Sequence, residues 1–264
     1  MSCLLKNGHL VSPAFELQGG ALFFKGGLIE AVIPAGDTLP EAGEVHDVGG
    51  RLVVPGFIDI HCHGRGGADF CDGTWQAFDT IGRGKIAEGV TGFLATTLTV
   101  GLDCLEATFA AAAEYGRQPT GAKLLGMHLE GPFISPACAG AQNPAFLRLP
   151  DLALVDRLNR IFPIRKVSFS PELPGGLAFA EGLVERGIMP SGAHTAADYA
   201  QFLAARAAGM KHLTHFCNVM TPMHHLHFGM DGGAFRCPDV LVEIIADGID
   251  QDCDGADGDA PEDT

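Results

Sequence analysis

The sequence predicts an α/β protein built on a (β/α)8 TIM-type barrel of about seven strands, preceded by a small β-rich element. From Phe57 onward, short apolar runs alternate with helical stretches such as 102–115 and 196–208. Strand–helix alternation indicates a parallel sheet covered by helices, and this many units indicates a barrel. The expected strands lie at 57–61, 92–98, 123–129, 165–169, 187–190, 212–216 and 240–246.

The ends of the chain differ from this middle part. Apolar runs at 3–5, 21–24 and 28–33 are broken by Gly and Pro, which predicts short strands joined by turns. We therefore expect a β-rich element at 1–50, half of a composite β domain, and a barrel at 51–249. An acidic tail at 250–264 is expected to lie outside the fold. No eighth strand follows 240–246, so the barrel is expected to be incomplete at its C-terminal end.

Composition excludes several classes of partner. The 264 residues carry a formal net charge of −15, which argues against nucleic acid and membrane surfaces as partners because both are bound through clustered Lys and Arg. No signal peptide or membrane-spanning run of roughly 18 apolar residues is evident. The eight cysteines show no Cys-x-x-Cys spacing. That usage favours reduced thiols in a cytoplasmic protein.

The strongest motif is His61-Cys-His63, at the end of the first expected barrel strand. Alternation along a strand would place both imidazoles on one face. The carboxyl ends of barrel strands point to the active-site mouth, and two imidazoles placed there suit zinc or iron. The alternative is a pair of surface histidines at a strand end.

Three more strand ends carry candidate ligands: Glu130, His194 and His215. Taken alone, Glu130 could be a solvated turn residue and His194 a structural imidazole. Together with the His-x-His pair, these residues predict a centre that can hold two metal ions. The remaining histidines are interpreted as structural: His9, His46 and His212. Contact with substrate is left open for three histidines in a loop near the barrel mouth, namely His224, His225 and His227.

These motifs resemble a known family. Residues 55–64 (PGFIDIHCHG) resemble the opening metal motif of the amidohydrolase superfamily. Four further segments are similar to N-acetylglucosamine-6-phosphate deacetylases: 128–136 (HLEGPFISP), 140–146 (GAQNPAF), 191–195 (SGAHT) and 214–225 (THFCNVMTPMHH). The resemblance covers roughly residues 1–249.

The resemblance implies a reaction and a set of roles. The reaction is hydrolysis of the acetamide of N-acetylglucosamine 6-phosphate, giving acetate and the free amine. The cofactor is one or two divalent ions, zinc or iron. The implied metal ligands are Glu130, His194 and His215, with His61 and His63 matching members that hold a second ion. The implied amino-sugar contacts are Ala141, Asn218 and Val219.

The chain departs from the family near its end. The family's acid–base Asp at the end of the eighth strand has no counterpart, so no catalytic residue is assigned. Asp250 stands where the family has a His beside the substrate carbonyl. Leu226 stands where an Arg binds the sugar phosphate. Either His227 or a neighbouring subunit supplies that charge, or the preference for a phosphorylated sugar is lost.

The tail resembles the acidic Asp-Gly-x-Asp-x-Asp-Cys-Asp-Gly repeats of secreted bacterial proteins that bind metal. It does not fit an EF-hand, because Pro261 occupies the twelfth position counted from Asp250. The shared string Asp247-Gly-Ile249 indicates a junction there, with drift of a solvated tail as the alternative.

We therefore expect a metal-dependent amino-sugar deacetylase whose substrate is a phosphorylated amino sugar, and a homodimer if the barrel is complete. The alternatives are another barrel amidohydrolase of dihydroorotase or deaminase type, a metal-binding fragment without turnover, and a secreted cation-binding protein. Open strand edges also predict poor folding or aggregation of the chain expressed alone.

Overall fold

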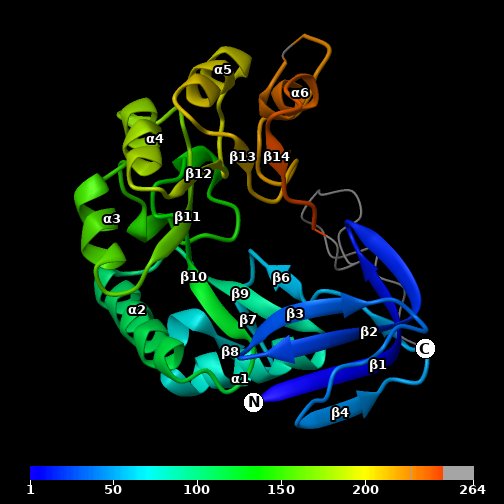
Figure 1. Ribbon diagram of the computed structural model, residues 1–264. Helices are drawn as coiled ribbons and strands as arrows, with labels where there is room; N and C mark the ends of the chain where they lie inside the picture. Colours follow the sequence, from blue (N-terminus) through cyan, green and yellow to red (C-terminus); the bar gives the residue numbers. More distant parts are fainter. Residues whose placement is uncertain (227, 246–264) are drawn as a thin grey trace, which may run out of the picture. The chain divides into compact units, whose positions relative to one another are not determined.

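The computed structural model describes residues 1–226 and 228–245 (Figure 1). The chain divides into two compact units, of which the first is Met1–Phe57 and the second begins at Ile58. The division into 1–50, 51–249 and 250–264 stays a prediction, and its last part lies outside the described residues.

The first unit is a five-stranded sheet. Strands β1 and β2, which are consecutive in the chain, pair antiparallel. Strands β4 and β5 both pair with β1 in parallel. The strand path is β3-β2-β1-β4, and Leu4, Ala21 and Ile33 form a small core. The strands are β1 (Ser2–Ser12), β2 (Phe15–Lys25), β3 (Leu28–Ile33), β4 (Glu44–Asp47) and β5 (Leu52–Val53).

The second unit contains a curled seven-stranded sheet with the path β14-β13-β12-β11-β10-β9-β6. The pairs from β9 to β14 are parallel, which confirms the barrel-type prediction. Among the described residues the path ends at β6 and β14, so the sheet is a partial barrel. Its strands are β6 (Phe57–Asp59), β9 (Val90–Thr96), β10 (Lys123–Glu130), β11 (Ile164–Phe169), β12 (Met189–Gly192), β13 (His212–Leu213) and β14 (Leu241–Val242).

Helices follow the outer side of this curled sheet (Figure 1). They are α1 (Trp75–Ala87), α2 (Leu102–Arg117), α3 (Leu152–Asn159), α4 (Gly176–Glu185), α5 (Tyr199–Ala207) and α6 (Met230–Arg236). Shorter elements connect them: β7 (Gly64–Arg65), β8 (Ala68–Asp69), η1 (Phe70–Asp72), η2 (Pro136–Cys138) and η3 (Pro144–Phe146). Apolar residues from helices and strands form one continuous core in this unit. No helix in the described ranges has the length and apolar content needed to cross a membrane.

Local chemistry explains where some elements begin. The helix expected at 196–208 starts at Tyr199, because Asp198 caps it and Gln201 completes a reciprocal capping box. Thr74 caps α1 by accepting a hydrogen bond from the backbone of Ala77.

The expected strand at 57–61 is too long by two residues. The Asp59 carboxylate accepts a hydrogen bond from the His61 backbone amide at 2.9 Å, which turns the chain out of the ladder. The Cys62 amide then donates to the Thr96 hydroxyl. His61 and His63 therefore lie in a loop beyond β6, and strand alternation does not account for their common direction.

Candidate metal centre

Five side chains from four strand ends meet at one place in the second unit. We call Glu130, His61, His63, His194 and His215 the histidine–glutamate cluster. The Glu130 carboxylate lies at its centre and is almost completely buried. The distances from its oxygens to the ring Nε2 atoms are 3.1 Å for His215, 3.1 Å for His63, 3.4 Å for His61 and 3.6 Å for His194.

The cluster contains two donor triads that share Glu130. One comprises His61, His63 and Glu130, and the other comprises Glu130, His194 and His215, with the donor atoms of each triad lying within 4.8 Å of one another. The Nε2 atoms of His194 and His215 are 3.1 Å apart, and those of His61 and His63 are 3.3 Å apart. Imidazole nitrogens and carboxylate oxygens are ligands for zinc and iron, so the donor set fits one or two divalent ions.

The backbone is strained where this cluster is built. His194 follows β12 with φ of 47°, and His215 follows β13 with φ of 33°. Two neighbours, Cys217 and Val219, have φ of 73° and 51°. Positive φ is uncommon for residues other than glycine and is costly for the branched Val219. Strain of this kind persists at functional sites when the surrounding structure enforces it.

Two histidines are held by partners outside the cluster. The His194 Nδ1 lies 3.0 Å from the Cys138 carbonyl oxygen, and the His61 Nδ1 lies 2.9 Å from the Glu243 carboxylate. These acceptors assign the proton to Nδ1 and leave the Nε2 lone pair facing Glu130. Metal-ligating histidines are commonly oriented by such acceptors.

Glu130 is oriented by Gln142. The Gln142 amide nitrogen donates to Glu130 at 2.7 Å, and its carbonyl oxygen accepts from the Thr99 backbone at 2.7 Å. Burial tends to raise the pKa of Glu130, but its contacts with His194, His215 and His63 outweigh burial and hold that pKa well below its usual range. The carboxylate is thus ionised and ready to accept a cation.

Lys166 and Glu243 form an ion pair beside the cluster. The Lys166 side chain is fully buried, and its Nζ contacts one Glu243 oxygen while the other oxygen faces His61. Burial tends to raise the pKa of Glu243, but the hydrogen bond from His61 and the charge of Lys166 bring it to about 2. Burial lowers the pKa of Lys166 despite its carboxylate partner.

A chain of polar side chains crosses the interior of the sheet. Neighbouring members lie 2.6–3.1 Å apart, and all are buried. The order is Thr96, His128, Ser168, Thr214, Ser191 and His212. Burial lowers the pKa of His128 strongly and that of His212 to about 4. Both imidazoles are therefore neutral members of this structural chain.

The residues expected to contact the amino sugar lie on loops near the cluster. A Cβ placed on Gly140, next to Ala141, would lie 3.1 Å from a Val219 methyl and 3.5 Å from the His194 ring. The Asn218 backbone N–H donates to the His215 backbone carbonyl at 3.0 Å. Their substrate roles stay predictions. Leu226 is exposed, while His227 and Asp250 lie outside the described residues.

Sequence reasoning missed three supporting residues. Gln142 lies within the motif at 140–146, but only Ala141 received a role there. Lys166 and Glu243 received no role, and the structure pairs them with each other. Lys166 and Glu243 each carry a charge within an otherwise apolar barrel run, and that was an available signal for a polar interior contact.

Comparisons with known proteins identify relatives of this chain. No family model matches the chain. The N-acetylglucosamine-6-phosphate deacetylase of Bacillus subtilis is 34% identical over 94% of this chain and 64% of its own length. The N-acetylgalactosamine-6-phosphate deacetylase of Escherichia coli O157:H7 is 33% identical over 94% and 65%.

A solved structure matches as well. The crystal structure of N-acetyl-D-glucosamine-6-phosphate deacetylase from Mycobacterium smegmatis superposes with a TM-score of 0.83 and 30% identity, covering 94% of this chain and 69% of that one. The chain belongs to the N-acetylglucosamine-6-phosphate deacetylase family. This membership places it in the amidohydrolase superfamily and confirms the resemblance drawn from the motifs. The chain spans between about half and just under two thirds of the length of the curated relatives it matches.

Proposed function

We propose that this protein is a metal-dependent hydrolase that removes the N-acetyl group of N-acetylglucosamine 6-phosphate, producing glucosamine 6-phosphate and acetate in amino-sugar catabolism. One observation carries the proposal: two donor triads converge on the shared, ionised Glu130 carboxylate. Family membership supplies the substrate class. A catalytically inactive metal-binding chain is the alternative, and another type of barrel amidohydrolase is not favoured by the relatives.

Separate sets of residues would bind the metal ions and the substrate. Glu130, His194 and His215 would hold one divalent ion, and His61 and His63 with Glu130 would hold a second. A divalent cation supplies hydroxide near neutral pH and polarises a carbonyl oxygen. Ala141, Asn218 and Val219 would hold the amino sugar beside the cluster. The departing amine must also be protonated, and we assign that role to no residue of this chain.

The sugar epimer is a further part of the proposal. The relatives named for N-acetylglucosamine 6-phosphate and for N-acetylgalactosamine 6-phosphate are almost equally similar, at 34% and 33% identity. The galactosamine epimer is therefore the second candidate substrate. We also propose zinc or iron as the metal, a cytoplasmic location and, if the barrel is complete, a homodimer.

Metal content and turnover must be measured separately to test the proposal. We expect the purified 264-residue chain to contain zinc or iron by elemental analysis, and to release acetate from N-acetylglucosamine 6-phosphate. His194→Ala should lose metal and reduce turnover by at least about 100-fold, since even residues that orient ligands affect activity 10–100-fold. Both epimers should be tested at equal concentration.

The matched control is His9→Ala, in the first unit, where His9 pairs with Glu16 at 2.7 Å. It should leave metal content and turnover at the parent level. Metal without acetate release from either epimer would favour the inactive metal-binding alternative. Full metal content in His194→Ala would overturn the ligand assignment itself.

A further inference from the structure

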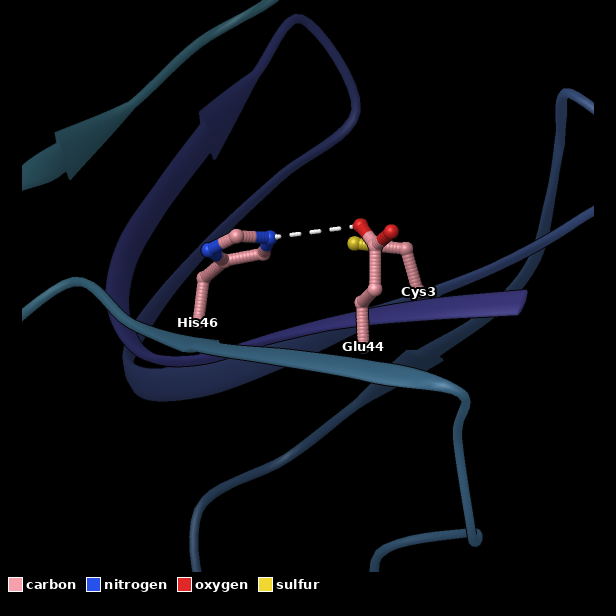
Figure 2. Close-up of side chains that lie close together, drawn as sticks. All are labelled: Cys3, Glu44 and His46. Atoms are coloured by element: carbon pink, nitrogen blue, oxygen red, sulfur yellow. Dashed lines mark ion pairs between the residues drawn. The ribbon is translucent and has the colours of Figure 1, made fainter. Parts of the chain in front are cut away.

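A third group of donor side chains lies in the first unit, within its five-stranded sheet. Cys3 comes from β1, while Glu44 and His46 come from β4 (Figure 2). Figure 2 shows the Cys3 sulfur beside the Glu44 carboxylate, with the His46 ring facing that carboxylate. The His46 Nε2 is 3.7 Å from a Glu44 oxygen, and the three donor atoms lie within 4.8 Å of one another.

The strand register holds these residues together. In the parallel pairing of β1 with β4, Cys3 is opposite Glu44, and His46 is two residues further along. Residues two apart on a strand share a face, so Glu44 and His46 project on the side where Cys3 lies. The Ser2 hydroxyl accepts a hydrogen bond from the Gly43 amide at 3.0 Å, which fixes the start of the pairing.

The spacing suits a small tetrahedral ion. Zinc binds sulfur at about 2.3 Å and nitrogen or oxygen at about 2.0–2.2 Å, so its ligand atoms lie about 3.4–3.6 Å apart. The His46–Glu44 distance is already close to that value. The His46 and Glu44 side chains are 59% and 57% exposed. They can therefore rotate to close the remaining gap to Cys3.

We propose that Cys3, Glu44 and His46 form a zinc site separate from the histidine–glutamate cluster. A thiolate with an imidazole favours zinc over magnesium or calcium, which prefer oxygen ligands. Three protein ligands leave a fourth position for water. The strand β4 lies at the end of the strand path of this sheet. The ion would therefore cross-link this edge strand to β1, joining Cys3 to Glu44, which lies 41 residues later in the chain.

Cobalt(II) provides a probe that separates the two metal sites. Thiolate coordination gives cobalt a near-ultraviolet charge-transfer absorption, whereas the histidine–glutamate cluster offers no thiolate among its donors. We expect this band when cobalt is added to the metal-free full chain, and its displacement by zinc. Cys3→Ser should abolish the band, and His46→Ala should weaken cobalt binding at this site by more than about 100-fold, above the cost of losing an orienting residue.

Two control variants make the result decisive. Cys104→Ser removes a partly buried thiol in α2, and His9→Ala removes another histidine of the first unit; both should retain the band. Hydrogen exchange of the β4 amides should slow when zinc is added to the parent and stay unchanged in His46→Ala. Absence of the band in the parent, or its persistence in Cys3→Ser, would overturn the zinc site and leave the proposed deacetylase function untouched.

Discussion

The two regions that gather candidate metal-ligand side chains are built differently. In the second unit, Glu130 is almost fully buried and is contacted by Gln142 and by four histidines. In the first unit, Glu44 and His46 are more than half exposed and rest on a regular strand pair. Both regions supply a carboxylate and an imidazole, so the difference lies in what surrounds the donors.

This difference bears on affinity. A buried donor set whose rotamers are fixed by hydrogen bonds loses little side-chain entropy when an ion binds. Two exposed side chains must be ordered at that moment, at about 0.5–1.5 kcal/mol each. We therefore expect tight binding at the histidine–glutamate cluster and weaker binding at Cys3, Glu44 and His46.

The largest effect should come from the same substitution made in both regions. Glu130→Gln removes the carboxylate shared by two triads, so we expect loss of metal from the cluster and a fall in turnover of at least about 1,000-fold, since metal activation of the nucleophile is lost. Glu44→Gln should lower zinc affinity only at the site formed by Cys3, Glu44 and His46. Elemental analysis measures the metal content of each variant, and acetate release measures its turnover. Equal loss of metal from the two variants would show that burial does not distinguish the regions.

An intermediate effect should follow from Glu243→Gln. This change leaves the five cluster residues in place but removes the carboxylate that accepts from His61. Loss of an orienting acceptor weakens metal binding by about 10–100-fold. Competition with a chelator should show this loss in the ion held by His61 and His63, with the ion held by His194 and His215 less affected. An unchanged affinity for both ions would mean that Glu243 serves the fold alone.

The smallest effect concerns acid stability of the metal-free chain. The Glu243 pKa is lowered to about 2, so its charge contributes stability that is present above the ordinary value of 4.5 and is lost as the pH falls toward 2. That shift corresponds to about 3 kcal/mol. Because burial lowers the pKa of its partner Lys166, part of this gain is offset, and we expect about 1–2 kcal/mol.

The measurement is urea unfolding followed by the fluorescence of Trp75, the single tryptophan, which lies in α1 of the second unit. The free energy of unfolding should fall more steeply between about pH 5 and about pH 3 in the parent than in Glu243→Gln. Parallel curves would contradict a stabilising role for this charge.

Much of the second unit could be predicted from the sequence. Apolar runs separated by helical stretches located the parallel strands, since burial on both faces makes such strands apolar along their length. Strand ends in a barrel meet at one mouth, so Glu130, His194 and His215 could be assigned to one site. The predicted length of the strand at 57–61 was wrong because the Asp59 side chain competes for the His61 amide.

The supporting contacts could not be predicted in this way. Gln142 reaches Glu130 across 12 residues, and Glu243 reaches His61 across 182. No local periodicity encodes such pairs, because they depend on how strands and loops pack. His46 was interpreted as structural for the same reason: its relation to Cys3 exists only through the pairing of β1 with β4.

The sequence by itself determined the candidate ligand residues, their places after apolar strand runs and the family, because these depend on residue identity and on the order of short segments. Only the tertiary structure decided which nitrogen of each oriented histidine faces inward and which side chains hold the carboxylates. It alone brought a thiol from the first strand to a carboxylate and an imidazole on the fourth. The physical reason is that orientation comes from long-range hydrogen bonds and strand register, which chain proximity does not specify.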